Sequence, residues 1–272
     1  MKRVLTALVL APLVWVLLRH AAAWPFHIAV AATLTAAILE SHGIFRARGA
    51  RPLSVPGTLI AWGVAASFIE LPWIDVPLAM PLTLGTVVVL MLAMALRREP
   101  GEMLDAVTST LFPVLLIGLS LGHLMALRDF GGGLVGRELV FLLFLCVMLG
   151  DSAAYYVGSS IGKRRIAPTL SPKKSLEGAI GGIAASVLAA LAVRTWFWQD
   201  LPLEHALILG VLLAVAGIFG DLAESLFKRA AGVKDASALL PGHGGVLDRI
   251  DGLLFAAPVL FYYYRTFLGH AA

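Results

Sequence analysis

The stretch EHALILGVLLAVAGIFGDLAESLF, residues 204–227, decides the class of fold. A helix needs about 20 predominantly apolar residues to cross a bilayer, and this run is long enough. The whole chain has the same character, because 59% of its 272 residues are hydrophobic and only 14% are charged. A chain segment in lipid must satisfy its own backbone hydrogen bonds, which favours helices. We therefore expect an all-α, polytopic integral membrane protein.

Similar apolar runs recur along the chain, and we interpret them as about nine transmembrane helices. They cover residues 4–18, 21–39, 57–71, 76–96, 106–127, 137–159, 177–197, 204–227 and 252–268. We expect one integral membrane domain, residues 1–272. Within it, residues 1–130 form a hydrophobic helical scaffold, and residues 137–268 carry the helices and loops of the functional site.

The basic residues predict the orientation of the chain if successive loops alternate between the two sides of the membrane. All but five of the 21 Lys and Arg residues then fall on the side that holds the N-terminus; the five are Arg19, Arg128, Arg137, Arg194 and Arg265. Cytoplasmic loops carry an excess of basic residues, so we expect a cytoplasmic N-terminus. The net charge of +4 suits an anionic lipid surface or a phosphate-bearing substrate, and no nucleic acid partner is expected.

The first apolar run has two interpretations. MKR, the run and Ala21–Ala23 imitate a secretory signal peptide with a small-residue cleavage site. Arg19 and His20 disrupt that pattern, which favours a retained helix. Cleavage would leave the remaining topology unchanged.

Polar residues interrupt the end of the stretch 204–227. Asp221, Ser225 and Lys228 are spaced i, i+4 and i+7, so they share one face of a helix. A charge at the bilayer centre costs roughly 2.5–3.5 kcal/mol on insertion scales, so such residues face a cavity or each other. An ion pair between Asp221 and Lys228 at the interface is the alternative.

Two further carboxylates precede the last apolar segment. Asp248 and Asp251 are three residues apart and share a face if the chain is already helical there. If Asp221 lies beside them, the charges repel unless a cation lies between them. The only cysteine, Cys146, excludes a cysteine zinc cluster, and hard oxygen ligands select magnesium. Asp221, Asp248 and Asp251 are therefore candidate metal ligands.

The turn PGHGG, residues 241–245, comes directly before these aspartates. Its glycines, Gly244 and Gly245 among them, permit a tight turn whose amides can approach an anion closely. His243 and Arg249 add donors for phosphate oxygens. A plain helix connector is the alternative interpretation.

Asp151 lies in the element of residues 149–178 and is followed there by a loop with five basic residues, Lys163, Arg164, Arg165, Lys173 and Lys174. Its run Lys163–Arg165 is typical of a topology signal or a contact with lipid headgroups. The motif SPKKSLEG, residues 171–178, predicts a helix that begins at Ser171 and Pro172. Lys173 and Lys174 lie where such a helix start attracts anions.

The residues SLFKRAAGVKDASALLPGHGGVLDRID, Ser225–Asp251, resemble the signature of the CDP-diacylglycerol synthases, also called phosphatidate cytidylyltransferases. They satisfy every constrained position of S-x-[LIVMF]-K-R-x4-K-D-x-[GSA]-x2-[LIF]-[PGS]-x-H-G-G-[LIVMF]-x-D-R-[LIVMFT]-D. GDSAAYYVG, residues 150–158, and SPKKSLEG are similar to that family too. The first 130 residues match only as hydrophobic helices.

The resemblance implies that CMP is transferred from CTP to phosphatidate, which gives CDP-diacylglycerol and pyrophosphate in phospholipid biosynthesis. It also implies a magnesium requirement, leaves a second, monovalent cation open, and suggests a homodimer in the cell (inner) membrane with a cytoplasmic active site. The implied catalytic residues are Asp221, Ser225, Lys228, Asp248 and Asp251. The implied contacts to substrate phosphates are Asp151, Lys173, Lys174, Lys228, Arg229, Lys234, His243, Gly244, Gly245 and Arg249.

Other classes of function remain open. An ion-coupled transporter also uses intramembrane carboxylates and broken helices, although here the charges gather at one face beside a basic loop. A catalytically silent relative that acts as a membrane scaffold is a second alternative. The DGxxAR run of CDP-alcohol phosphotransferases is absent, and a lipid kinase would not carry the complete signature.

Overall fold

The computed structural model describes residue 16 and residues 22–69, 75–97, 99–233, 236–237 and 244–269. Within these ranges the chain is helical and has no β-strand, although an isolated bridge joins Arg165 and Ser175. The all-α prediction is thereby confirmed. The predicted segment 4–18 lies, apart from Val16, outside the described residues.

Five helical stretches in the described part of the chain are long and apolar enough to cross a membrane. They are Ala23–Ala47, Ala79–Leu96, Pro100–Ile161, Leu176–Trp196 and Leu203–Ala230. Ser54–Ala66 is a shorter apolar helix. A polytopic membrane protein is supported, whereas nine spans and a cytoplasmic N-terminus stay predictions.

The chain forms two compact units. The first comprises residues up to Ala126 together with Phe227–Arg249, and the second comprises Leu127–Leu226 and the residues from Ile250 onward. The division falls within three helices: α6 (Leu119–Asp129), α9 (Leu203–Ala230) and α10 (Leu247–Tyr263). The single domain expected from the sequence stays a prediction.

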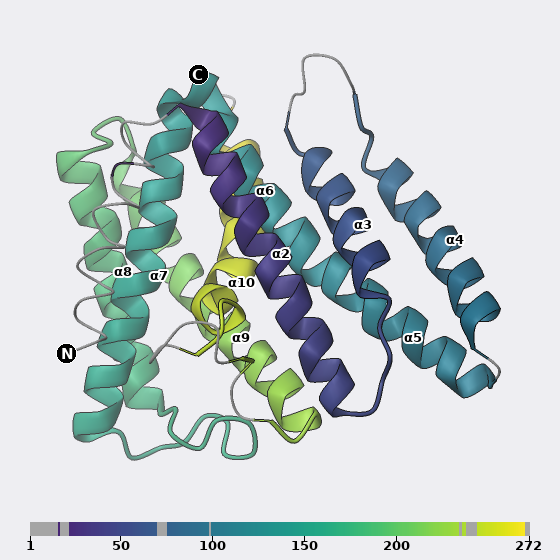
Figure 1. The fold of residues 1–272 in the computed structure, drawn as a ribbon. Helices are drawn as coiled ribbons and strands as arrows, with labels where there is room; N and C mark the ends of the chain where they lie inside the picture. Colours follow the sequence, from purple (N-terminus) through teal and green to yellow (C-terminus); the bar gives the residue numbers. More distant parts are fainter. Residues whose placement is uncertain are drawn as a thin grey trace. The chain divides into compact units, whose positions relative to one another are not determined.

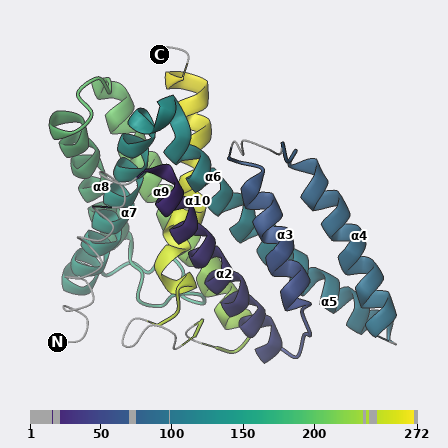
Figure 2. The same ribbon diagram turned by 45° about the horizontal axis from the view of Figure 1, so that its top comes forward.

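The first unit contains the helices of the predicted scaffold. They are α2 (Ala23–Ala47), α3 (Ser54–Ala66), α4 (Ala79–Leu96), α5 (Pro100–Pro113) and the π-helical turn η1 (Val114–Gly118), with the start of α6. Helix α3 lies between α2 and α4 and contacts both (Figures 1 and 2). The backbone amide of Leu53 donates to Thr110 Oγ1 at 2.8 Å, which joins the start of α3 to α5.

Two prolines set the limits of α5. Pro100 occupies the first turn, where a helix needs no amide donor, and Glu102 in the same turn complements the helix dipole. Pro113 ends the regular helix, because its ring removes one backbone donor and crowds the preceding turn. The chain continues as the π-helical turn η1.

Helix α4 presents large apolar side chains outward. Leu84, Val87, Met91 and Met94 are about half exposed or more. A contiguous apolar surface of this kind is unfavourable in water and suits lipid or a partner. The exposure therefore agrees with a membrane-embedded helix.

The second unit is built from longer helices. It contains the 3₁₀ turn η2 (Phe130–Gly133), α7 (Leu134–Ile161), α8 (Leu176–Trp196), most of α9 and α10, and the π-helical turn η3 (Tyr264–Leu268). Helices α7 and α8 lie side by side over much of their length (Figures 1 and 2).

Glycines allow α7 and α8 to approach closely. A Cβ added to Gly178 would lie 2.7 Å from the backbone oxygen of Ala154, and one added to Gly182 would lie 2.9 Å from that of Gly150. Real Cβ atoms do not approach a backbone oxygen so closely, and neither helix backbone can move away without losing contacts. The GxxxG pair Gly178 and Gly182 is thus a helix-packing motif.

We expect Gly182→Ala to destabilise the protein by about 1–3 kcal/mol, the usual cost of overpacking, despite alanine's better helix propensity. Gly43→Ala is the matched control, because nothing lies within 4 Å of a Cβ added to Gly43 in α2. Thermal unfolding in detergent, followed by circular dichroism, measures both variants. Equal melting temperatures for the two would contradict the packing role.

Candidate active site

The crossing of α9 and α10 in the second unit brings two acidic residues together. A Cβ added to Gly220 of α9 would overlap the backbone oxygen of Asp251 of α10. Close by, a Cβ added to Gly252 would lie 3.5 Å from Gly217 Cα. Gly220 directly precedes Asp221, and Gly252 directly follows Asp251. The helices can therefore touch backbone to backbone exactly where Asp221 and Asp251 leave them.

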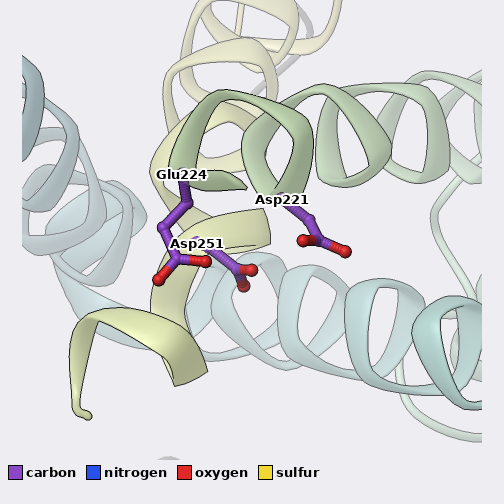
Figure 3. Close-up of side chains that lie close together, drawn as sticks. All are labelled: Asp221, Glu224 and Asp251. Atoms are coloured by element: carbon purple, nitrogen blue, oxygen red, sulfur yellow. The ribbon is translucent and has the colours of Figure 1, made fainter. Parts of the chain in front are cut away.

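Asp221, Glu224 and Asp251 form an acidic cluster at this crossing (Figure 3). Each side chain offers one oxygen, and the three oxygens lie within 4.8 Å of one another. Glu224 is buried, with 4% of its surface exposed, and the two aspartates are half-buried. Three carboxylates at this separation repel one another unless a cation or protons lie among them. Carboxylate oxygens are the ligands that hard divalent cations prefer.

Lys174 provides one positive charge beside the acidic cluster. Its Nζ lies 2.6 Å from Asp221 Oδ2, and it also donates to the backbone oxygen of Ile218 at 3.4 Å. Ser225 Oγ is 3.5 Å from the other oxygen of Asp221, which is a long hydrogen bond. Asp221 and Ser225 therefore share one face of α9, as predicted. The positive charge beside Asp221 is the ammonium of Lys174, which belongs to the loop before α8.

The start of α8 differs from the prediction that placed it at Ser171 and Pro172. The helix begins at Leu176, and Ser175 is its N-cap, whose Oγ accepts from the Gly178 amide at 3.1 Å. The Leu176 amide donates instead to the Arg164 oxygen at 2.8 Å, which holds the preceding residues in a turn. Glu177 lies in the first turn of the helix. Its carboxylate accepts from the amides of Lys163 and Arg164.

A small cleft in the second unit lies between α7, α8 and α9. Small and apolar residues dominate its lining, and Asp151 is its only charged member. The lining residues are Val147, Gly150, Asp151, Ala154, Gly182, Leu213, Ala214, Gly217 and Ile218. Asp151 Oδ2 is also 3.7 Å from the position of a Cβ on Gly252. An apolar cleft therefore adjoins the helix crossing that carries the acidic cluster.

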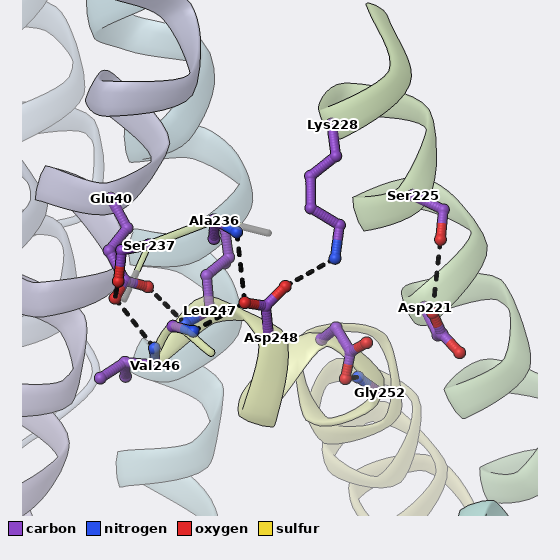
Figure 4. A network of polar contacts seen from close by, with 12 residues as sticks. Glu40, Asp221, Ser225, Lys228, Ala236, Ser237, Val246, Leu247, Asp248 and Gly252 are labelled. Atoms are coloured by element: carbon purple, nitrogen blue, oxygen red, sulfur yellow. Dashed lines mark hydrogen bonds and ion pairs between the residues drawn. The ribbon is translucent and has the colours of Figure 1, made fainter. Parts of the chain in front are cut away.

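A second group of charges lies in the first unit. Lys228 Nζ and Asp248 Oδ1 form an ion pair at 2.6 Å, and both side chains are largely buried, with 12% and 8% of their surface exposed. Asp248 Oδ2 accepts from the backbone amides of Gly245 at 2.7 Å and Ala236 at 3.2 Å (Figure 4). This carboxylate is held by one cation and two amides, which offsets the cost of its burial.

The model of the cytidylyltransferase family matches residues 1–267. This chain belongs to the cytidylyltransferase family.

Individual relatives cover from about half to nearly all of the chain. It is 32% identical over 275 residues to the phosphatidate cytidylyltransferase of Bacillus subtilis, with 98% of each chain covered. It is 47% identical over 133 residues to the phosphatidate cytidylyltransferase of Haemophilus influenzae, covering 47% of this chain and 46% of the relative. An uncharacterized Escherichia coli protein, YnbB, is 35% identical over 216 residues, with 75% and 69% covered.

The predicted site residues of this cytidylyltransferase lie in different surroundings. The structure brings Asp221 and Asp251 together, whereas Asp248 makes the contacts with Lys228 and two amides described above. Lys234 and His243 lie outside the described residues. Roles in catalysis, metal binding or phosphate binding stay predictions for all of them, including Asp151, Lys173, Lys174, Ser225, Arg229, Gly244, Gly245 and Arg249.

The sequence interpretation missed two acidic residues of this cytidylyltransferase. Glu224 carries a local signal, because it follows Asp221 by three residues and so shares its helix face. Glu40 of α2 accepts from the amides of Val246 and Leu247 at 2.9 and 2.7 Å. No pattern within the sequence links residues so far apart.

We expect the acidic cluster to bind a divalent cation in the folded protein. Saturating Mg²⁺ should then raise the melting temperature, since a ligand at a hundredfold its Kd stabilises by about 2.7 kcal/mol. Glu224→Gln should reduce the shift, because it removes one ligand charge while preserving the side chain's shape. Differential scanning fluorimetry in detergent, with and without a chelator, measures the shift.

The control is Glu204→Gln, since Glu204 lies exposed in the first turn of the same helix. This variant should keep the full Mg²⁺-dependent shift. If Glu224→Gln shows the same Mg²⁺-dependent rise in melting temperature as the unsubstituted protein, Glu224 is not a ligand of the cation.

Proposed function

We propose that this protein is a phosphatidate cytidylyltransferase that makes CDP-diacylglycerol. A phosphate oxygen of phosphatidate attacks the α-phosphorus of CTP, and the bond from that phosphorus to the β-phosphate's bridging oxygen breaks. Pyrophosphate leaves with the bonding electrons. The attacking phosphate is already ionised near neutral pH, so we assign no general base.

The observation that carries this proposal is the match to a phosphatidate cytidylyltransferase along 98% of the chain. The signature-like stretch Ser225–Asp251 supports it separately. The charges of both units also suit the reaction, because negative charge develops on phosphoryl oxygens during such transfers and cations stabilise it.

Magnesium is the cation that we propose for the acidic cluster. Asp221, Glu224 and Asp251 offer three hard oxygen ligands within 4.8 Å of one another, and such oxygens fit this ion. Bound there, magnesium would neutralise negative charge on phosphate oxygens. The predicted role of Asp248 as a further ligand, and a second, monovalent cation, remain part of the proposal.

Basic side chains of this protein would bind and orient the phosphates. Lys174 is half-buried and its ammonium lies beside Asp221, so it can neutralise a phosphate oxygen at that position without a large movement of its side chain. Lys228 is held in one position by Asp248. We assign Lys228 and Arg249 to further phosphate oxygens, and Ser225 to orienting Asp221. Fixed cations of this kind need little rearrangement during the reaction, which favours the transition state.

The reaction joins a membrane lipid to a soluble nucleotide, so we place it at the cytoplasmic face of the cell membrane. The asymmetry of basic residues along the sequence supports this orientation, with a cytoplasmic N-terminus and nine spans. A homodimer is the assembly that the family resemblance suggests.

Pyrophosphate release by purified protein in detergent micelles tests the proposed function. The assay contains CTP, phosphatidate and Mg²⁺, and each component is omitted in turn. Strict dependence on all three, with CDP-diacylglycerol as the lipid product, is the expected result. An absence of turnover by demonstrably folded protein would favour a catalytically silent relative instead.

We expect Asp248→Asn to insert and fold but to lose turnover by at least about a hundredfold, the scale of losing one precisely placed electrostatic group. The substitution removes the charge that holds Lys228 while it keeps the size of the side chain. Initial rates at saturating CTP and phosphatidate measure the loss. Asp200→Asn, at an exposed turn residue, should retain full activity. Near-normal turnover of Asp248→Asn would exclude an essential role for Asp248.

A further inference from the structure

Glu40 of α2 contacts residues about two hundred positions later in the chain. Its side chain is buried, with 7% of its surface exposed. One carboxylate oxygen accepts from the Val246 amide at 2.9 Å and from the Ser237 hydroxyl, and the other accepts from the Leu247 amide at 2.7 Å (Figure 4). Every residue in this network belongs to the first unit.

The contact falls at the N-terminus of α10. A helix begins with amide groups that have no partner within the helix, and its dipole favours negative charge at that end. Val246 and Leu247 are at this start, so Glu40 stabilises it as a cap supplied by a different helix. Glu40 also limits the neighbouring position, because a Cβ added to Gly245 would lie 2.7 Å from its carboxylate.

Asp248 holds the same segment by neighbouring groups. Its Oδ2 accepts from the amides of Gly245 and Ala236. Gly245 directly precedes Val246, and Ala236 directly precedes Ser237; Val246 and Ser237 both donate to Glu40. Glu40 and Asp248 therefore accept hydrogen bonds from adjacent residues in two stretches of the chain, 236–237 and 245–247. The remaining oxygen of Asp248 pairs with Lys228. A shift of this segment away from Glu40 would move Asp248 and, with it, the Lys228 ammonium.

We infer that Glu40 is a positioning residue of the transferase, which fixes the start of α10 so that Asp248 holds Lys228 in its working place. Glu40 acts through the backbone and does not touch a substrate. The inference rests on the proposed function for its activity readout, whereas its structural part is independent of any activity. A role in folding alone would lower stability and activity together.

Glu40→Gln is the central test. The amide keeps the size of the side chain but replaces one acceptor oxygen with an NH₂ group that faces backbone donors. We expect kcat to fall roughly 10–100-fold, the range that a small misplacement of a catalytic group produces, while KM for CTP and phosphatidate changes less than threefold. The melting temperature should stay within a few degrees of the unsubstituted protein's. Glu102→Gln, an exposed glutamate of α5, is the matched control and should behave like the unsubstituted protein.

Hydrogen–deuterium exchange provides a readout that does not need activity. The amides of Val246 and Leu247 should exchange faster in Glu40→Gln, while those in α3 should keep their protection. If the unsubstituted protein makes no CDP-diacylglycerol, the proposed function fails, and this exchange still decides whether Glu40 holds the segment. Unchanged exchange at these two amides would overturn the inference in either case.

Two further variants keep the test decisive if Glu40→Gln does not fold. Ser237→Ala removes one donor to Glu40, and Glu40→Asp retains the charge on a shorter side chain. We expect both to fold and to lower kcat by a smaller factor than the loss expected for Glu40→Gln, because each keeps the negative charge of residue 40. Wild-type kcat in every variant that folds, or a loss of activity that merely follows the melting temperature, would overturn the positioning role.

Discussion

A carboxylate on an apolar helix is costly unless a cation or hydrogen-bond donors surround it, and the local arrangements of this protein follow from that constraint. Three acids of the described helices are compensated in different ways. Asp221 has Lys174, and Asp248 has Lys228 and two amides. Glu40 has two amides and a hydroxyl. The acidic cluster brings three carboxylates together beside Lys174, which makes it the natural place for a bound cation.

Glycine makes these approaches possible. Gly220 and Gly252 let α9 and α10 touch where Asp221 and Asp251 leave their helices, and Gly182 does the same for α7 and α8. Gly245 leaves room for the carboxylate of Glu40. In lipid, close backbone packing replaces the hydrophobic force that joins helices in water, so small residues serve both the fold and the site. The arrangement of charged side chains in this family member therefore depends on glycines, which have no side chain and let the helices approach.

The predicted apolar segments match the described helices best in the later part of the chain. Segments 177–197 and 204–227 correspond to α8 and α9 within a few residues. Helix ends were harder to predict, because they depend on partners elsewhere: the Leu176 amide bonds to Arg164, which moves the start of α8 beyond Ser171. Asp221 pairs with Lys174 and not with Lys228 of its own helix. Helical periodicity could not predict this pair, because Lys174 belongs to a different segment of the chain.

The sequence by itself determined a helical membrane protein, the family signature in Ser225–Asp251, and which helix faces carry charge. These properties depend on composition and on the spacing of near neighbours, both of which are local. Only the tertiary structure decided that Asp251 joins Asp221 and Glu224, and that Glu40 holds the start of α10. A contact between residues far apart in the chain depends on how whole helices pack, and no short stretch of sequence contains that information.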